Sequence, residues 1–384
     1  MRYKLQDIVD VTMGQSPKSE FYNNDGEGVP FLQGNRTFGF KYPTFDTFTT
    51  MVTKEAKAGD VIMSVRAPVG DLNITPVDIC LGRGVCSLRM KNGNQEFLYY
   101  MMKYYIPQLI NKESGTVFGS VNRNDIIELE IDIPNDAEKQ GKISRFLSML
   151  DEKIQINNKI NNNLEQQAQT LFTAWFENFE PFGGVAPDSW KQVTLGDIAE
   201  IKTNSFNPQK NPDAQIEHYS IPAFDEKKYP VFESASDIKS NKYILTNNSV
   251  MVSKLNPDTK RVWRPLCITD LAVSSTEFII FEPFNPVYKD YVYSIIDSKG
   301  FTDWMCSHTT GSTNSRQRTA PGTTLNYLIW LPDQDAMDNF LSTVTPMYDL
   351  IAHNLFQNQE LISLRDSLLP KLMSGELDVS NIDL

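Results

Sequence analysis

A heptad pattern free of proline and glycine runs from residue 143 to residue 175 and constrains the fold more than any other feature. Its steps alternate between four and three residues, as in the seam of a coiled coil. The predicted seam consists of Ile143, Leu147, Leu150, Ile154, Asn157, Asn161, Leu164, Ala168, Leu171 and Trp175. A helix of about 35 to 40 residues would be roughly 50 to 60 Å long. Because a single helix cannot bury such a stripe, the pattern predicts a partner helix.

The partner is predicted in the same chain, near the C-terminus. The same steps recur there in Phe340, Val344, Met347, Ile351, Asn354, Asn358, Leu361, Arg365, Leu368 and Leu372. Both stretches have two consecutive asparagines in the seam, and buried asparagines fix the register because each amide needs a partner. We therefore predict an antiparallel pair of helices. The alternative is two unrelated amphipathic helices in separate cores, and Pro346 is expected to kink the second helix or to mark its start.

The regions between the helices also repeat. Three short apolar segments of the first half have counterparts in the second half, in the pairs 5–11 and 195–201, 60–64 and 249–253, and 129–134 and 327–332. The members of the last pair read as strands that end at a proline and precede an acidic helix start. Residues 180–187, rich in Pro and Gly, are the clearest linker.

The predicted fold class is α+β, with two strand-rich mixed domains, two long helices packed as an antiparallel coiled coil, and a pseudo-twofold internal repeat. The expected boundaries are 1–136 for the first domain, 137–179 for the first helix, 180–334 for the second domain, and 335–384 for the second helix and the tail.

Composition excludes several classes of protein. The sequence contains no apolar run of membrane-spanning length and no signal-peptide core after Met1. Its four cysteines form no Cys-x-x-Cys pair, so we expect no zinc site, no disulfide framework and a cytoplasmic location. The net charge of −12 argues against nucleic acid, but half of the acidic excess lies in residues 335–384. The two domains therefore leave room for a local basic face.

Polar, glycine-containing loops separate the matching strands of both halves. Arg, Gln, Asn and Ser can read base edges, and glycine lets a backbone approach phosphate. The alternative is that these loops are ordinary solvated turns. The candidate DNA-contacting residues are Gln15, Ser16, Gln33, Asn35, Arg36, Arg66, Arg83, Ser114, Thr116, Ser120, Asn122, Arg123, Lys254, Lys260, Arg261, Arg264, Thr310, Ser312, Asn314, Arg316 and Arg318. A rigid spacer with two dissimilar heads suits a DNA target whose two parts flank a gap.

The first helix closes with Leu164-Glu165-Gln166-Gln167-Ala168-Gln169-Thr170-Leu171-Phe172-Thr173-Ala174-Trp175-Phe176-Glu177-Asn178-Phe179, and the second with Leu364-Arg365-Asp366-Ser367-Leu368-Leu369-Pro370-Lys371-Leu372-Met373-Ser374-Gly375-Glu376-Leu377. With these helix ends the chain resembles the specificity (S) subunits of type I restriction–modification systems. The resemblance extends over nearly the whole chain and is weaker in the two domains. It implies two target-recognition domains that each read one part of a bipartite double-stranded DNA sequence.

The resemblance also implies partners. Two modification (methyltransferase) subunits are expected on the helices, with restriction subunits added in some systems. S-adenosylmethionine is expected on the methyltransferase, with no cofactor, metal or catalytic residue on this chain. The predicted coiled-coil and partner-binding residues are Leu147, Leu150, Ile154, Asn157, Asn161, Leu164, Leu171, Phe172, Trp175, Phe176, Ile351, Asn354, Asn358, Leu361, Leu368 and Leu372. The aromatic end of the first helix, including Phe179, could dock a partner subunit or pack on the adjacent domain.

Enzymatic alternatives have little support in the sequence. No Asn/Asp-Pro-Pro-aromatic element, Gly-x-Gly-x-x-Gly element or Walker loop is present. Pro212-Asp213 followed by Asp225-Glu226-Lys227 fits a degenerate nuclease pattern that holds Mg²⁺ between carboxylates. The alternatives to a DNA specificity subunit are a coiled-coil scaffold that binds proteins, a target subunit of another restriction system and, with least support, this nuclease.

Overall fold

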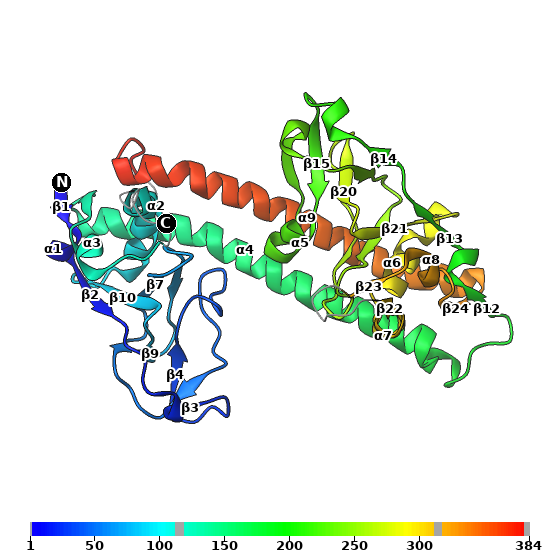
Figure 1. Cartoon of the computed structure of the whole chain (residues 1–384), viewed down its shortest axis with the longest axis horizontal. Coiled ribbons are helices and arrows are strands. Elements are labelled where there is room, and N and C mark those ends of the chain that lie inside the picture. Colours follow the sequence, from blue (N-terminus) through cyan, green and yellow to red (C-terminus); the bar gives the residue numbers. More distant parts are fainter. Residues whose placement is uncertain (1, 112–118, 311–316, 380–384) are drawn as a thin grey trace. The chain divides into compact units, whose positions relative to one another are not determined.

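The computed structural model describes residues 2–111, 119–310 and 317–379, and the chain forms two compact units (Figure 1). Unit 1 comprises Met1–Ile156 and Asn358–Leu384, and unit 2 comprises Asn157–Gln357. The two longest helices, α4 (Ala137–Phe172) and α9 (Gln334–Ser374), each contribute residues to both units. Unit 2 is therefore a continuous segment of the sequence, whereas unit 1 is assembled from both ends of the chain.

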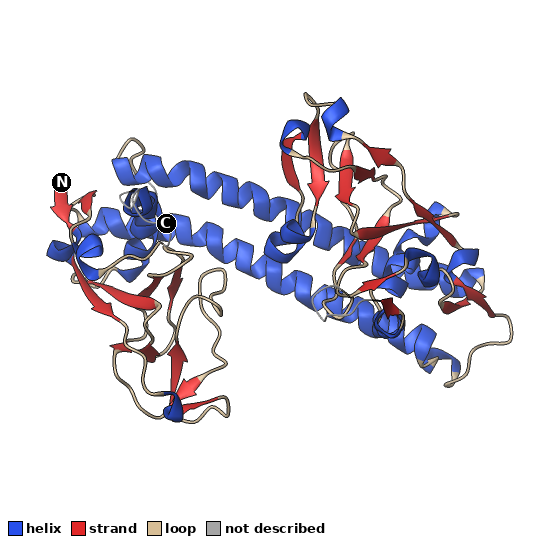
Figure 2. Ribbon diagram, viewed as in Figure 1, coloured by secondary structure: helices blue, strands red, loops and turns tan. Residues whose placement is uncertain are grey.

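Unit 1 combines short strands with helices at its edge (Figure 2). Its other elements are β1 (Arg2–Lys4), α1 (Leu5–Ile8), β2 (Val9–Met13), β3 (Tyr22–Asn23), β4 (Val29–Leu32), β5 (Phe48–Thr49), β6 (Glu55–Ala56), β7 (Val61–Ser64), β8 (Leu72–Ile74), β9 (Ile79–Leu81), β10 (Val85–Met90), α2 (Gln95–Asn111), α3 (Arg123–Ile127) and β11 (Glu130–Asp132).

Unit 2 repeats this composition. Its other elements are β12 (Lys191–Thr194), β13 (Ala199–Lys202), β14 (Ser205–Phe206), β15 (Gln215–Tyr219), α5 (Ile221–Lys227), β16 (Val231–Ser234), β17 (Lys242–Ile244), β18 (Val250–Ser253), β19 (Val262–Trp263), β20 (Ala272–Ser275), β21 (Phe278–Pro283), α6 (Lys289–Ile296), α7 (Lys299–Ser307), β22 (Thr309–Thr310), β23 (Arg318–Thr319), α8 (Pro321–Thr324) and β24 (Leu328–Leu331).

The sheets confirm the internal repeat. The order β2-β10-β7-β8 in unit 1 matches β13-β21-β18-β19 in unit 2, and the pair β1-β11 matches β12-β24. The larger sheets share a core of four strands, β6-β9-β4-β5 and β17-β20-β15-β16, each with a central parallel pair. They differ in the fifth strand, because β3 pairs with β5 whereas β14 pairs with β17. The two sheets thus share four strands, and the fifth strand is added at opposite edges in the two units.

The three repeated segments behave largely as expected. Segments 60–64 and 249–253 contain β7 and β18, whose residues are all buried. Segments 129–134 and 327–332 contain β11 and β24. Acidic caps begin the long helices, because the Asp136 and Asp333 carboxylates accept hydrogen bonds from the backbone N–H groups of Glu138 (2.9 Å) and Ala336 (3.0 Å). Segments 5–11 and 195–201 each contain a short helical turn before the strand.

The two long helices are antiparallel within each unit (Figure 1). In unit 2, Asn354 Nδ2 donates to Asn161 Oδ1 at 2.8 Å, and Asn157 Nδ2 donates to Gln357 Oε1 at 2.9 Å. In unit 1, Arg365 Nη1 lies 2.6 Å from Asp151 Oδ1. Within these pairs, residues closer to the C-terminus of α4 contact residues closer to the N-terminus of α9, as in antiparallel helices. The predicted antiparallel coiled coil is confirmed, including one of its asparagine pairs.

The predicted seam is wrong in one helical turn, where Asp151 takes the place of Leu150. Leu150 is only half-buried, whereas Asp151 is fully buried between the helices and also accepts a hydrogen bond from the Tyr100 hydroxyl at 2.7 Å. Arg365 fits the seam because this carboxylate neutralises it. Pro346 does not mark the start of the second helix, because α9 begins twelve residues earlier at Gln334 and Pro346 is exposed to solvent.

Each unit has its own hydrophobic core, which includes residues of both long helices. The unit 1 core joins Ile143 and Leu147 of α4 with Leu369, Leu372 and Met373 of α9. The main unit 2 core contains the aromatic end of α4 and the residues of α6, α7 and α9 that face it. Each strand-rich region is therefore fixed to its own part of the two helices by apolar burial.

Candidate nucleic-acid interface

Five polar segments of unit 1 meet at one edge of its sheets. We call residues 14–16, 33–36, 65–66, 82–84 and 120–123 loop cluster 1; the first four segments follow strands β2, β4, β7 and β9, and the last leads into α3. Backbone hydrogen bonds tie them together: Gln15 N to Leu81 O (2.9 Å), Gly82 N to Leu32 O (2.7 Å), Gly84 N to Gln33 O (2.9 Å), Val65 N to Gly84 O (2.9 Å) and Val121 N to Val65 O (3.0 Å). Loops predicted separately from the sequence therefore form one surface.

Glycines allow this close approach. A Cβ atom on Gly14 would overlap the carbonyl oxygen of Gly82, and one on Gly82 or Gly84 would overlap the backbone of Gln33. Three backbones can meet here only because these positions have no side chain. The cluster is consequently a fixed platform from which the neighbouring side chains project.

The side chains of loop cluster 1 fall into two groups. Gln15, Gln33, Arg66 and Arg83 are exposed, and their side chains have no hydrogen-bond or ion-pair partner among residues 2–111, 119–310 and 317–379. The others already have partners: Arg36 with Asp46 (2.7 Å), Asn35 with Asp71 (2.6 Å), Ser16 with the backbone N–H of Arg83 (3.2 Å), and Asn122 with the first turn of α3. Arg123 begins α3 and is exposed, as is Ser120.

A cavity of about 330 Å³ opens beside this platform, lined by residues 31–37 together with Asp46 and Thr47. The predicted residues Gln33, Asn35 and Arg36 all line it. Amide and guanidinium donors on one rim suit contacts with the acceptors of bases and phosphates.

Unit 2 has an equivalent arrangement, loop cluster 2, made of residues 254–256, 275–277, 309–310 and 317–318. Its backbone links are Lys254 N to Glu277 O (2.9 Å), Asn256 N to Gln317 O (2.9 Å) and Thr319 N to Lys254 O (3.1 Å). An isolated bridge pairs Leu255 with Arg318, just as Arg66 pairs with Ser120 in loop cluster 1. The bridge is the clearest counterpart between the two clusters.

The predicted cations of unit 2 are mostly engaged within the protein. Arg261 holds Asp225 through Nε and Nη2 at 2.6 and 2.9 Å, and Arg264 holds Asp290 at 2.7 and 3.3 Å and Asp349 at 2.8 Å. Lys254 Nζ donates to the Thr276 carbonyl at 2.7 Å. Arg261 and Arg264 thus have a structural role that the sequence did not reveal.

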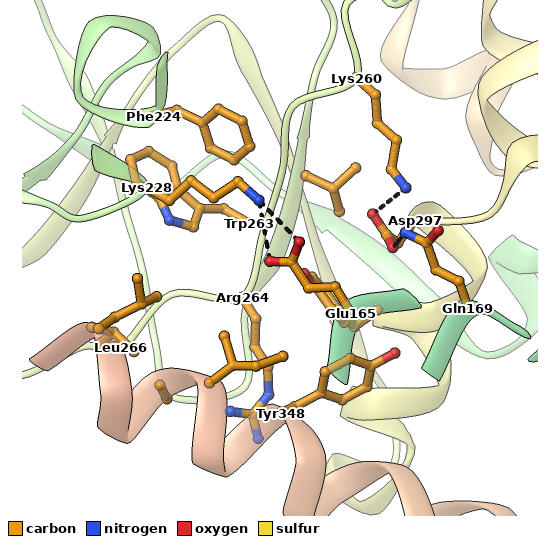
Figure 3. Close-up of a pocket in the computed structure, with 15 residues that line it drawn as sticks. Glu165, Gln169, Phe224, Lys228, Lys260, Trp263, Arg264, Leu266, Asp297 and Tyr348 are labelled. Carbon is orange, nitrogen blue, oxygen red and sulfur yellow. Dashed lines mark hydrogen bonds and ion pairs between the residues drawn. The ribbon is translucent and has the colours of Figure 1, made fainter. Parts of the chain in front are cut away.

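Lys260 points into a cavity of about 240 Å³ within unit 2 (Figure 3). Its Nζ lies 2.6 Å from Asp297 Oδ1, and Lys228 pairs with Glu165 of α4 across the same cavity at 3.1 Å. Burial raises the pKa of Asp297 despite the Lys260 charge. Burial alone would lower the pKa of Arg264, but Asp290 and Asp349 outweigh it and raise that pKa. These pairs fasten the strand-rich part of unit 2 to α4 and α9 and form no open cationic surface.

Five predicted residues lie outside the described parts of the chain: Ser114, Thr116, Ser312, Asn314 and Arg316. Thr310 is exposed on β22 and pairs with Arg318 on β23. Conversely, the sequence did not single out Glu277, Asp46 or Asp71, the acidic partners of predicted DNA-contacting residues. Residues 82–84 of unit 1 correspond to the turn after β20 in unit 2, so an alignment of these two turns in the sequence would have pointed to Glu277.

The aromatic residues at the end of α4 and in the π-helical turn that follows it, Thr173–Glu177, pack inside unit 2. Phe172 and Phe176 are buried, and their rings lie 6.3 and 4.8 Å from the ring of Phe340. Trp175 contacts Phe182 and Phe340 with ring centroids 5.8 and 6.1 Å apart. Phe176 also lies 5.4 and 5.0 Å from the rings of Trp190 and Tyr291, so of the two roles considered the structure shows packing on the adjacent domain, which leaves the buried Phe172 and Phe176 rings unavailable to a partner subunit.

The nuclease pattern is not assembled as its chemistry needs. Asp225 lies on helix α5, and its carboxylate is occupied by Arg261. Asp213 and Glu226 are exposed to solvent. Among the described residues, no group of three or more His, Cys, Asp or Glu side chains is placed to hold a metal ion. Likewise, no helix in those parts of the chain has the length and apolarity needed to cross a membrane.

Comparison with known proteins connects this architecture to one family. Residues 1–166 match the type I restriction modification DNA specificity domain. The chain is 26% identical to the type I restriction enzyme MjaIX specificity subunit of Methanocaldococcus jannaschii, over 99% of this chain and 94% of the relative. It is 23% identical to the HindI specificity subunit of Haemophilus influenzae, over 84% of this chain and 88% of the relative.

Two further known proteins are similar to this chain, one over part of its length and one over nearly all of it. The match to a provisionally assigned MjaX specificity subunit of M. jannaschii is 37% identical but spans 42% of this chain and only 38% of that relative. The fold is similar to that of the type I restriction–modification S subunit from M. genitalium, with a TM-score of 0.60 and 16% identity over 97% of this chain and 96% of the other. Residues 1–166 thus carry a type I restriction modification DNA specificity domain, and nearly the whole chain is similar to specificity subunits of type I restriction enzymes.

Proposed function

We propose that the chain reads a split double-stranded DNA target, one part with loop cluster 1 and the other with loop cluster 2. The repeated bridge carries this proposal: Arg66 with Ser120 and Leu255 with Arg318 occupy the same place in the two repeated frameworks. Equivalent frameworks suit equivalent tasks, and the different side chains around the bridges suit two different half-sites. The target need not be palindromic, since the two readers are not identical.

Within each cluster we assign base contacts to the exposed donors and backbone contacts to the glycine-rich edges. Gln15, Gln33, Arg66 and Arg83 are the strongest candidates in unit 1, because no other described side chain occupies their donors. In unit 2 the strongest candidate is Arg318, whose side chain is 44% exposed. Lys260, Arg261 and Arg264 are better assigned to holding unit 2 together.

We further assign α4 and α9 to holding two modification subunits, which would carry S-adenosylmethionine, with restriction subunits as additional partners. Large apolar side chains remain exposed on both helices: Met149 and Ile156 of α4 and Leu364 of α9 in unit 1, and Ile160 of α4 with Leu350 and Phe356 of α9 in unit 2. Apolar residues at such positions support docking of another protein. The free cysteines suit a cytoplasmic location.

The test is a genome-wide map of adenine methylation in host cells with and without this gene. We expect one motif, two short parts around a fixed gap, to disappear when the gene is deleted. An unchanged map in cells that express the modification subunit would refute the proposal. Binding of purified chain to duplex DNA should also weaken steeply with salt, since lysine and arginine contacts to phosphate release counterions.

A second test addresses the partner surface. The double variant M149E/I156E places two charges among the exposed apolar residues of α4, and the modification subunits should no longer co-purify with it. K159E changes an exposed residue of the same helix and serves as the control. Equal recovery of the modification subunits with both variants would show that this face of α4 is not the docking surface.

A further inference from the structure

Among the described residues of unit 2, three arginines hold a carboxylate through both Nε and Nη2, and one of these three is open to a ligand. The side chains of Arg261 and Arg264 are 14% and 17% exposed, whereas that of Arg318 is 44% exposed. Arg318 Nε lies 3.1 Å from Glu277 Oε2, and Nη2 lies 3.2 Å from Glu277 Oε1. Arg318 therefore combines a fixed guanidinium with solvent access.

The backbones of both residues are anchored to the same segment. Arg318 pairs with Thr310 across β22 and β23 and with Leu255 in the bridge. The carbonyl of Glu277 accepts a hydrogen bond from Lys254 N at 2.9 Å. With the backbone of each partner held and the ion pair two-pronged, the plane of the guanidinium is set before any ligand arrives.

The edge of the Arg318 guanidinium that Glu277 leaves free determines which ligand it can bind. A guanidinium offers two edges for paired hydrogen bonds, and Glu277 occupies the one formed by Nε and Nη2. The Nη1–Nη2 edge remains, and it matches the two acceptors, O6 and N7, that guanine presents in the major groove. The adjacent carboxylate disfavours a phosphate, because two anions would then lie side by side. A neutral base edge meets no such repulsion.

We propose that Arg318 reads a guanine in the half-site assigned to unit 2, and that Glu277 is the positioning residue that aims it. This inference rests on the proposed function and specifies one of its contacts. The equivalent positions in unit 1 differ, because Gly84 stands where Glu277 stands and Ser120 stands where Arg318 stands. A fixed base reader on the bridge is thus a feature of loop cluster 2 alone.

The experiment uses the full chain expressed with its modification subunits and compares R318K, E277Q and wild type by methylation mapping. Lysine keeps the positive charge but loses the two-pronged edge. R318K should therefore lower the preference for G·C at one position of one half-site by about 5- to 150-fold. E277Q should lower the preference at the same position by a smaller factor, with an unchanged melting temperature.

R89K is the matched control. Arg89 is 43% exposed and its Nε lies 2.7 Å from an Asp60 carboxylate oxygen, but it lies in unit 1 outside both loop clusters. R89K should leave the motif unchanged. If R318K weakens methylation equally at every sequence, Arg318 contacts phosphate and the inference is wrong. An unchanged motif in R318K also overturns it, although a split motif in wild type would still support the proposed function. If R318K relaxes the motif and E277Q does not, the positioning role of Glu277 is wrong.

Discussion

Arg66 and Arg264 were predicted to have the same role, but the structure places them in opposite environments. Arg66 is exposed and forms no ion pair with the described part of the chain, whereas Arg264 is 17% exposed and joined to Asp290 and Asp349. We expect R66A to weaken duplex binding and to relax specificity at one position of the half-site assigned to unit 1, without lowering the unfolding midpoint. R264A should instead destabilise the fold by about 3 to 5 kcal/mol, because Asp290 is left buried without its partner.

Binding to the target duplex and to duplexes with single base-pair substitutions, together with chemical denaturation of both variants, separates the two roles. A loss of stability in R66A comparable to that in R264A would contradict this division. So would a normal unfolding midpoint in R264A together with weakened DNA binding.

Lys103 provides a pH-dependent prediction. Its Nζ lies 4.7 Å from the Tyr99 ring centroid, and burial, followed by the charge of Arg365, lowers its pKa to about 8. The unfolded chain has the ordinary pKa of 10.5 for this lysine, so between pH 8 and 10.5 only the unfolded state keeps the proton. The destabilising effect of Lys103 is complete below pH 8 and disappears as the pH rises towards 10.5.

K103M should therefore raise the stability at pH 7 by about 1 to 2 kcal/mol, after allowance for the lost cation–π contact. The gain should shrink steadily above pH 8. Denaturation midpoints of K103M and wild type from pH 6.5 to 10 test this, with K54M at an exposed position as the control. A gain that does not depend on pH would show that the charge of Lys103 is not its cause.

At the scale of elements, the buried pair Asp151–Arg365 decides how α4 meets α9 in unit 1. Its distance of 2.6 Å and its near-complete burial make each residue dependent on the other. D151L or R365L alone should destabilise unit 1 by about 3 to 5 kcal/mol, because a buried charge loses its partner. The double variant should recover most of that loss, since two leucines can pack in the seam. Urea denaturation of the three variants tests this, and additive losses would exclude the coupling.

The seam also illustrates what the sequence can and cannot predict. The heptad pattern predicted both helices and a pairing of their seam asparagines, of which Asn161–Asn354 is one, because the periodicity and the positions of the asparagines can be read from each helix alone. It did not identify Asp151, because a carboxylate in a seam is recognised only with its partner 214 residues away. In the candidate site, too, the sequence did not show which distant residues pair with each other. Its loops were predicted from composition, but the carboxylate that engages Arg261 comes from α5, 36 residues earlier in the chain.

At the scale of the whole molecule, the two units differ in continuity, and this predicts different behaviour in isolation. Unit 2 is one segment, Asn157–Gln357, whereas the core of unit 1 needs Leu369, Leu372, Met373 and Val379 from the far end of the chain. A fragment of residues 157–357 should fold cooperatively. A fragment of residues 1–156 should lack fixed tertiary structure until a peptide of residues 358–379 is added.

Near-ultraviolet circular dichroism of each fragment, with and without the peptide, tests this expectation. The peptide carrying L369D and L372D is the control, because it cannot restore the apolar contacts. A native spectrum for residues 1–156 alone would show that the end of α9 is dispensable for unit 1.

The sequence separation within the helix pair has a consequence for synthesis. Asn161 meets Asn354 193 residues later, and Asp151 meets Arg365 214 residues later. At about 5 to 20 residues per second, a ribosome exposes the seam of α4 for roughly 10 to 40 s before its partner emerges. Ser144, Ser148, Asp151, Asn157 and Asn161 keep that waiting surface partly polar. We therefore expect the polar residues of the seam, which include the register-fixing Asn161, to limit association between nascent chains on the same messenger RNA.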